Sequence, residues 1–208
     1  MDTTSVWRAA APRTALAPLQ GNVSADVLII GGGITGVTLA MLLAQQGRSV
    51  VLLEADAIGS GSTGNSTGNL YETLSQGLHT IASHWDRDVA RQVMVQRRAA
   101  IEFIEVLAGS ADCGFRRCDL CVYAVSQEQR ASISQEFTAL SQAGCSVRMN
   151  ASVPAPLPQP VSDALVLQGQ AQFQPQAYMA HIAALAAQAG AHLHEHSRVV
   201  ELLSLIHI

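Results

Sequence analysis

Hydrophobic residues between positions 26 and 54 fall into two short runs, separated by a glycine-rich break and a longer, mostly apolar stretch. Residues 26–30 are largely β-branched and aliphatic, which is typical of a buried parallel strand. Residues 34–46 favour a helix, and Gly47 follows where a glycine commonly ends one. A second strand is predicted over 49–53. Strand, turn, helix and strand together have the size of a dinucleotide-binding βαβ unit.

A membrane-spanning helix is the alternative interpretation of this region. Residues 27–44 carry no charge and are about as many as a bilayer requires. Gly31, Gly32 and Gly33 are consecutive, however, and each glycine weakens a helix by about 1 kcal/mol relative to alanine. We therefore predict a phosphate-binding turn here and no transmembrane segment.

The glycine spacing fits the chemistry of a dinucleotide. Gly31, Gly33 and Gly36 form G-x-G-x-x-G, in which the first glycine permits a tight turn and the second lets the backbone approach a pyrophosphate. The third lets the helix pack close to the strand, and the helix N-terminus presents free N–H groups to the phosphates. Glu54, 18 residues beyond Gly36, would accept hydrogen bonds from a ribose diol and disfavour an NADP-type cofactor.

A loop of small hydroxyl and amide residues, 59–69, follows the acid; we call it the hydroxyl-rich loop. Its composition fits a flexible surface linker. It equally fits a second cradle, in which backbone N–H and hydroxyl groups lie along an extended cofactor. Composition alone leaves both interpretations open.

The stretch 26–56 followed by IGSGSTGNSTGNL resembles the amino-acid-oxidase-like (DAO) family of FAD-dependent oxidoreductases, whose members include glycine, sarcosine and gamma-glutamylputrescine oxidases. The resemblance implies that the hydroxyl-rich loop runs beneath the pyrophosphate toward the flavin, with Thr63 in the family's hydroxyl position and Gly64 and Gly68 in its glycine positions. Residues 68–70 would approach the isoalloxazine. The loop contains no histidine, so a covalent flavin bond from it is not expected.

A second part of the resemblance lies near the other end of the chain. Residues 175–189 are predicted to form a helix that begins with proline and ends before Gly190, followed by a strand over 191–202. In the family, such a helix and strand return the chain to the FAD domain. The resemblance implies that the backbone of Val199 contacts the adenine.

The middle of the chain reads as a separate, substrate-side region. A long amphipathic helix is predicted over 86–108 and a strand over 119–125. Ser126 has capping-box spacing and begins a helix that ends before Gly144, while 153–160 reads as a stiff connector. The apolar side of the long helix is predicted to contain Val89, Val93, Ala100, Ile104 and Leu107.

Composition narrows the possible functions. The chain has 208 residues, 49% of them hydrophobic, so a sizeable core can form. Its net charge of −4 argues against a nucleic-acid partner. All 12 basic residues are arginines, which excludes a Schiff-base lysine, a pyridoxal phosphate site and a P-loop lysine within this chain. The N-terminus has no apolar segment of signal-peptide length, so we predict a cytoplasmic protein with reduced cysteines.

The cysteines permit a metal-cluster hypothesis. Cys113, Cys118 and Cys121 have C-x4-C-x2-C spacing, as in plant-type iron–sulfur sites, and Cys145 is a possible fourth ligand. Cys121 lies inside a strand pattern, however, and the segment lacks the glycine- and serine-rich loop that usually surrounds a cluster. We favour ordinary thiols.

Histidines and paired arginines offer two further hypotheses. His192, His194 and His196 would share one side of a strand and could bind a metal, but the family resemblance places this strand at the FAD domain and favours a solvated or packed face. We predict no metal. The arginine pairs 97–98 and 116–117 could recognise a substrate carboxylate or be solvated surface.

We therefore expect an α/β protein, α+β overall, in which a Rossmann-like βαβ FAD-binding domain carries an inserted, incomplete substrate domain. The predicted function of the parent protein, of which this chain is expected to be the N-terminal portion, is FAD-dependent oxidation of a C–N bond in a small-molecule amine or amino acid, with the electron acceptor left open. The portion alone is expected to be inactive. No catalytic residue is predicted. The predicted cofactor-binding residues are Gly31, Gly33, Ile34, Thr35, Gly36, Glu54, Ser62, Thr63, Gly64, Gly68 and Val199.

Two alternatives remain: an NAD-dependent Rossmann dehydrogenase and a catalytically inactive nucleotide-binding fragment. The first would place a third parallel strand soon after the acid, where this chain has the hydroxyl-rich loop. The second follows from the last residues, which stop within a strand pattern and resemble adapter-encoded sequence, so that the native chain is expected to end near 202 or 203. The expected division is an N-terminal extension (1–25), FAD-binding segments (26–78 and 171–203), a substrate-side region (79–170) and a non-native tail (204–208).

Overall fold

A computed structural model describes residues 4–10, 14–149 and 163–203 of the chain. The connector predicted at 153–160 and the tail predicted at 204–208 lie outside these residues. The chain divides into two compact units. Unit 1 comprises Met1–Gly68, Ser110–Cys113 and Gln174–Ile208, and unit 2 comprises Asn69–Gly109 and Gly114–Phe173.

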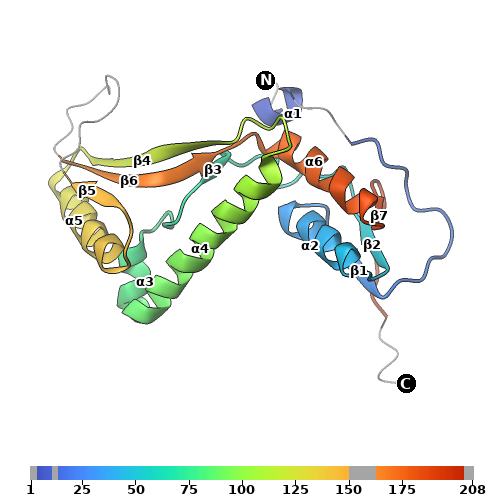
Figure 1. Cartoon of the computed structure of the whole chain (residues 1–208), viewed down its shortest axis with the longest axis horizontal. Coiled ribbons are helices and arrows are strands. Elements are labelled where there is room, and N and C mark those ends of the chain that lie inside the picture. Colours follow the sequence, from blue (N-terminus) through green and yellow to red (C-terminus); the bar gives the residue numbers. More distant parts are fainter. Residues whose placement is uncertain (1–3, 11–13, 150–162, 204–208) are drawn as a thin grey trace. The chain divides into compact units, whose positions relative to one another are not determined.

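Unit 1 is built on a parallel sheet with the order β1-β2-β7 (Figure 1). Its strands are β1 (Val27–Ile30), β2 (Val50–Leu53) and β7 (His192–His194). Helix α2 (Ile34–Gln45) connects β1 to β2 and packs against α6 (Pro175–Gln188). The βαβ unit and the parallel Rossmann-like sheet are therefore confirmed.

Local signals explain the limits of both helices. Gly47 has φ +78°, a conformation that favours glycine, and its N–H donates a hydrogen bond to the carbonyl of Ala44 at 2.9 Å. Pro175 occupies the first turn of α6, where no N–H is needed. The side chain of Gln174 caps that helix by accepting a hydrogen bond from Ala177 N–H at 2.6 Å.

The strand predicted over 191–202 is wrong in length, because β7 ends at His194. The N–H of His196 donates to the carbonyl of Asp56, and the next N–H, of Ser197, donates to the carbonyl of Glu54. His196 has φ 49°, which turns the chain out of the parallel ladder. Val199 consequently lies, half-buried, in an irregular segment rather than on a strand.

The N-terminal segment of unit 1 begins with the short helix α1 (Val6–Ala10) and continues without regular structure from residue 14 to β1. Its residues 17–20 line a cavity together with Val51 of β2 and two histidines of β7, His192 and His194. One face of the sheet is therefore partly covered by chain that precedes the βαβ unit.

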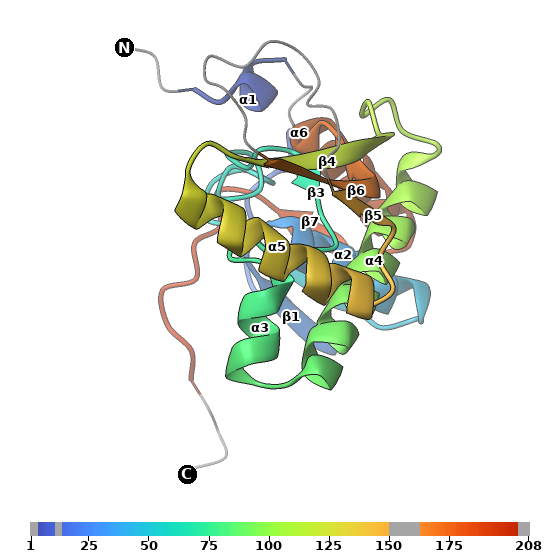
Figure 2. The same cartoon turned by 90° about the vertical axis from the view of Figure 1, so that its left-hand side faces the viewer.

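Unit 2 is an antiparallel sheet with helices on one face (Figures 1 and 2). Its central strand, β6 (Asp163–Gln172), pairs with β4 (Arg116–Ala124) on one side. On the other side it pairs with β3 (Asn69–Leu70) and β5 (Val147–Met149). The helices are α3 (Leu78–His84), α4 (Arg87–Ala108) and α5 (Gln127–Gln142).

The core of unit 2 joins all three helices to the sheet. Leu78 of α3, Met94 of α4 and Leu140 of α5 are almost completely buried, and they lie in one cluster with Leu165 and Leu167 of β6. Burying each such side chain contributes about 1.5–3 kcal/mol. None of the described helices is both long and apolar enough to cross a membrane.

The predicted start of α5 is confirmed, because the Ser126 hydroxyl accepts a hydrogen bond from Gln129 N–H. The buried side of α4 was predicted only in part, because Val89, Val93, Ile104 and Leu107 are half-buried. Ala100 is exposed, and the buried residues lie one position further along the helix, which rotates the core-facing row by about 100°. The buried residues of α4 are Ala90, Met94, Ile101 and Ala108.

Candidate functional site

The turn between β1 and α2 has the backbone geometry of a phosphate-binding loop. Gly31 has φ +104°, which side chains rarely tolerate, and its N–H donates to the carbonyl of Leu53 at 2.9 Å. A Cβ on Gly36 would lie 2.1 Å from the carbonyl oxygen of Gly31, so only glycine permits this approach of helix to strand. These two glycines are required by the fold itself.

Gly33 differs from both. Its φ of −78° suits any residue, and a Cβ there would meet only the Thr63 hydroxyl, at 3.5 Å. The packing of the described chain therefore does not require glycine at this position. The space beside Gly33 fits a ligand that approaches the backbone closely, as a pyrophosphate does in this type of turn.

The first turn of α2 offers donors to such a ligand. No side chain caps the helix at Gly33. The hydroxyl of Thr63 accepts a hydrogen bond from Ile34 N–H at 3.1 Å, which brings the hydroxyl-rich loop to the helix N-terminus. Apart from the Ile34 N–H, the N–H groups of this first turn are left for a ligand, and together with the positive end of the helix dipole they favour an anion.

Glu54, at the end of β2, is held beside the glycine turn. Its Oε2 accepts a hydrogen bond from Gly32 N–H at 2.6 Å, and its Oε1 accepts one from Asp56 N–H at 2.8 Å. An ionised carboxylate has about four acceptor positions, so each oxygen can still accept a further bond. The half-buried side chain is therefore suited to binding a diol next to the turn.

The hydroxyl-rich loop is folded on itself. Gly64 N–H donates to the carbonyl of Gly59 at 2.8 Å, and the Asn65 amide donates to the carbonyl of Gly61 at 2.9 Å. A Cβ on Gly59 or Gly64 would lie within 3 Å of Oε1 of Gln176. Backbone donors of a fixed loop at a helix N-terminus favour the cradle interpretation over the linker.

The remaining predicted cofactor-binding residues are Thr35, Ser62, Gly68 and Val199. Thr35 and Ser62 are exposed, whereas Gly68 is buried at the end of the loop with φ +71°. Val199 lies beyond the turn at His196, in the irregular segment after β7. The residues that the structure brings together are Gly31, Gly33, Ile34, Gly36, Glu54, Thr63 and Gly64.

Two buried residues beside the site, Gln176 and Glu195, were not predicted from the sequence. Gln176 donates from Nε2 to the carbonyl of Ile58 at 2.8 Å, and its buried Oε1 has no partner among the described residues. Glu195 is 2% exposed and accepts a hydrogen bond from Ile58 N–H at 2.7 Å. The sequence signal that could have identified Glu195 is its place in the alternating pattern HLHEH, where it falls on the same side as the buried Leu193.

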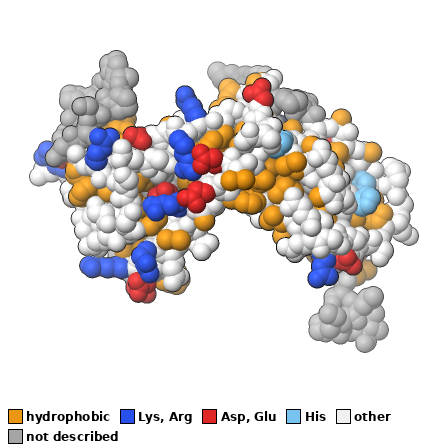
Figure 3. Space-filling model, in the orientation of Figure 1, with side chains coloured by type: hydrophobic (Ala, Val, Ile, Leu, Met, Phe, Trp, Pro, Cys, Tyr) orange, Lys and Arg blue, Asp and Glu red, His pale blue; other side chains and the backbone are white. Residues whose placement is uncertain are grey.

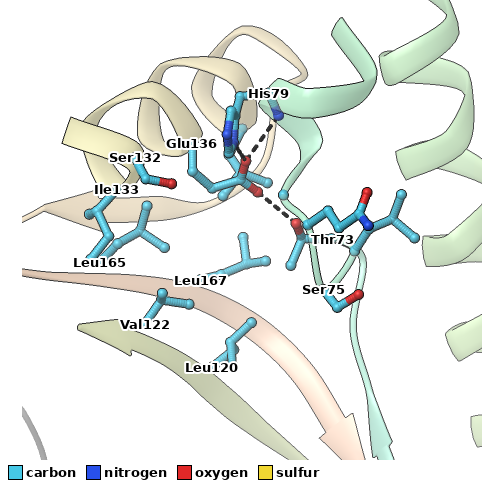
Figure 4. Close-up of a pocket in the computed structure, with 14 residues that line it drawn as sticks. Thr73, Ser75, His79, Leu120, Val122, Ser132, Ile133, Glu136, Leu165 and Leu167 are labelled. Carbon is cyan, nitrogen blue, oxygen red and sulfur yellow. Dashed lines mark hydrogen bonds and ion pairs between the residues drawn. The ribbon is translucent and has the colours of Figure 1, made fainter. Parts of the chain in front are cut away.

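Unit 2 contains a separate cavity of about 150 Å³ between α5 and the sheet (Figure 4). Glu136 lies at its polar end, where the Thr73 hydroxyl donates to Oε1 at 2.6 Å and the His79 N–H donates to Oε2 at 3.0 Å. Burial would raise the pKa of Glu136, but these donors and the Leu78 N–H outweigh burial and hold it below its usual value. Apolar side chains of the sheet, including Leu120, form the other end.

The arginine pairs are bonded within unit 2. Arg98 forms two hydrogen bonds with the carboxylate of Glu72, at 2.8 and 2.9 Å, and Arg117 pairs with Glu105. Figure 3 shows blue and red side chains in contact on the face that it presents. The Arg97 guanidinium donates to the carbonyl of Tyr71. These groups are engaged by the protein itself, which favours a structural role over substrate recognition.

The metal hypotheses gain no support. Within the described ranges, no three His, Cys, Asp or Glu side chains gather closely enough to hold a metal ion. Cys113 and Cys145 are buried, and neither forms a disulfide with another described cysteine. Burial, with the nearby Glu72 carboxylate, raises the pKa of Cys145 to about 11, so this thiol is protonated at neutral pH. His194 contacts the carbonyl of Ala17 instead of a ligand set.

Comparison with known proteins identifies the class to which this fold and site belong. Residues 26–205 match the family of FAD dependent oxidoreductases (DAO), and the chain belongs to that family. The resemblance found in the sequence, the fold class and FAD as the cofactor are thereby confirmed.

Three individual proteins illustrate what the chain is similar to. The chain is 27% identical over 198 residues to YhfW of Bacillus subtilis (strain 168), which is named as a Rieske 2Fe-2S iron-sulfur protein. It is 31% identical over 137 residues, or 64% of the chain, to the gamma-glutamylputrescine oxidoreductase of Escherichia coli (strain K12). The crystal structure of glycine oxidase from Geobacillus kaustophilus shares the fold, with a TM-score of 0.66 and 24% identity over 83% of the chain.

The matched regions are parts of longer proteins. The 198-residue match covers 94% of this chain but 38% of YhfW, and the E. coli match covers 32% of that enzyme. The structural match covers 46% of the glycine oxidase chain. This chain thus spans less than half the length of these relatives.

Proposed function

We propose that this protein oxidises a C–N bond of an amine or amino acid with FAD bound at the β1–α2 turn. The observation that carries the proposal is the convergence of an open glycine, an uncapped helix N-terminus and a fixed carboxylate. These are Gly33, the first turn of α2 and Glu54. Their chemistry matches a pyrophosphate next to a ribose diol.

The chain's own groups have separate roles in this proposal. N–H groups at the start of α2 bind the pyrophosphate, Glu54 accepts hydrogen bonds from the ribose, and the Thr63 hydroxyl fixes the loop against Ile34. Gly68 ends the loop, and Val199 is proposed to contact the adenine through its backbone. The redox chemistry would be supplied by FAD when it is bound, and the residues of this chain would contribute its orientation and electrostatics.

The proposed domain assignment follows from this site. Residues 26–78 and 171–203 would form the FAD-binding domain, and 79–170 the substrate-side region. The amine or amino-acid substrate class is supported by two relatives, a gamma-glutamylputrescine oxidoreductase and a glycine oxidase. No residue of this chain is assigned to the chemical step.

An NAD-dependent dehydrogenase is the less well supported alternative. Such an enzyme would place its third parallel strand soon after Glu54. Here β2 pairs with β1 on one side and with β7 on the other, and β7 comes from the opposite end of the sequence. The position of this strand, with the family match, favours FAD.

Visible absorption of the purified chain tests the proposal. Bands at about 375 and about 450 nm that survive desalting, or appear on adding FAD, would show a bound flavin. A folded protein that stays colourless with FAD but binds NADH would contradict it. Reduction of the flavin bands under anaerobic conditions by an amine or amino acid, and not by a 2-hydroxy acid, would test the substrate class.

A further inference from the structure

The N-terminal arm, residues 4–10 and 14–20, lies against the hydroxyl-rich loop. Its helix α1 carries Trp7, whose indole N–H donates a hydrogen bond to the backbone carbonyl of Ser66 at 2.8 Å. The Trp7 carbonyl accepts a hydrogen bond from Nε2 of Gln174 at 3.1 Å. One half-buried tryptophan thus joins the loop to the residue that caps α6.

A second connection holds the arm to the other end of the loop. The Thr14 hydroxyl and the Leu16 N–H both donate to the carboxylate of Glu195. That carboxylate also accepts the N–H of Ile58, the residue directly before the loop. Because Glu195 is almost completely buried, it fixes the arm and the start of the loop to the same point.

The arm also packs on the loop between these two connections. A Cβ on Gly64 would lie 3.5 Å from Cγ of Arg8, so the arginine stem passes close to the loop backbone. Arg8 and Thr14 line a cavity of about 180 Å³ together with Ser60 and Glu195. The arm therefore forms one wall beside the loop.

The hydroxyl-rich loop contains several glycines, and such a loop loses much conformational entropy when it is ordered. Contacts that order it before a ligand arrives reduce that cost at binding and raise affinity. We infer that the N-terminal arm is a positioning element of the FAD site, and that Trp7 is a positioning residue that holds the hydroxyl-rich loop in its cofactor-binding conformation. This inference rests on the proposed function.

Trp7→Phe is the variant that tests the inference, because it keeps an aromatic ring in place and removes the N–H donor. The chain offers a matched control in its other tryptophan, Trp85, which is 76% exposed at the end of α3. We expect Trp7→Phe to raise the Kd for FAD about 3- to 10-fold, the effect of one lost hydrogen bond. Trp85→Phe should leave the Kd unchanged.

A second readout is independent of flavin. Amide hydrogen exchange of residues 59–68 in the FAD-free chain should be faster in Trp7→Phe than in Trp85→Phe, while exchange in β2 stays the same. The melting temperature of both variants shows whether the tryptophan acts only on global stability. A lower melting temperature with unchanged FAD affinity and unchanged loop exchange would mean a merely structural role and would overturn the inference.

The outcomes also separate this inference from the proposed function. If the unmodified chain binds FAD and both variants bind it equally well, the inference is wrong and the proposed function stands. If the unmodified chain is folded but does not bind FAD, the proposed function fails. In that case the inference fails with it as a statement about the FAD site, and faster loop exchange in Trp7→Phe would show only that the arm orders the loop.

Discussion

The carboxylate of Glu54 accepts a hydrogen bond of 2.6 Å from the backbone N–H of Gly32. This contact connects the end of β2 to the glycine turn that follows β1. The two strands are parallel, with Ile30 paired to Leu53, so their ends meet at the same edge of the sheet. The acid is therefore positioned by the fold before any ligand is present.

Replacing this acid should affect both stability and cofactor binding. In Glu54→Gln the side chain loses its charge and one acceptor oxygen, so Gly32 N–H or Asp56 N–H loses its partner. We expect the free energy of unfolding to fall by about 1–3 kcal/mol and FAD affinity to fall with it. Urea denaturation and FAD titration measure the two effects, with the exposed Glu201→Gln as control. Equal behaviour of the two variants would contradict the role given to Glu54.

Gly33→Ala should separate cofactor binding from folding. The methyl group meets only the Thr63 hydroxyl, at an ordinary contact distance, so the melting temperature should change little. The same methyl group occupies the space beside the backbone that a pyrophosphate needs, and we expect FAD to bind about tenfold more weakly, or roughly 1.4 kcal/mol. Gly109→Ala, at the end of α4 and outside the proposed site, is the matched control, because its φ of −59° suits any residue and the nearest atom to a Cβ there is the Val106 carbonyl oxygen at 3.4 Å. FAD binding that is unaffected by Gly33→Ala would place the cofactor elsewhere.

The βαβ unit could be predicted because its signals are local. Glycine spacing fixes the turn around Gly31, and apolar runs fix both strands. The buried side of α4 could not be predicted in the same way. Val89 and Ala90 are neighbouring apolar residues, and it is the packing of Ala90 in one cluster with residues of α3, α5 and β6 that decides which of the two is buried.

Distant contacts limited the prediction of the site. The strand after His192 ends because the N–H groups of His196 and Ser197 bond to carbonyls near the end of β2, which no pattern within 191–202 reveals. The contact between Trp7 and Ser66 joins residues 59 positions apart. The glycines and the acid could therefore be predicted from the sequence, whereas the groups that hold the loop could not.

Glu136 should make the stability of unit 2 depend on acid pH. Its pKa lies below the usual value because donors from Leu78, Thr73 and His79 outweigh the effect of burial. The ionised form therefore stabilises the folded state above the ordinary glutamate pKa of about 4.3, and this stabilisation is lost as the pH falls through the lower, folded-state pKa. Urea midpoints between about pH 7 and pH 3 should fall less steeply in Glu136→Gln than in the unmodified chain.

Other carboxylates titrate in the same range, so a control is required. Glu102 is exposed on α4, and Glu102→Gln is the matched control with which the slope of Glu136→Gln is compared. At neutral pH, Glu136→Gln should be about 1–3 kcal/mol less stable, because the Thr73 hydroxyl and the His79 N–H compete for one acceptor. An unchanged slope in Glu136→Gln would contradict the assignment.

Two ion pairs of α4 should differ in strength according to their burial. The Glu72 side chain is 8% exposed and its partner Arg98 36%, whereas Arg117 and Glu105 are 34% and 43% exposed. Arg98→Met leaves a buried carboxylate without its partner and should cost about 2–4 kcal/mol, less than for a fully buried pair because Arg98 is partly solvated. Adding Glu72→Gln should recover part of this loss, with a coupling energy above about 1 kcal/mol. The same cycle at Arg117 and Glu105 should give less than about 1 kcal/mol, and equal coupling at both sites would show that burial does not determine their strength.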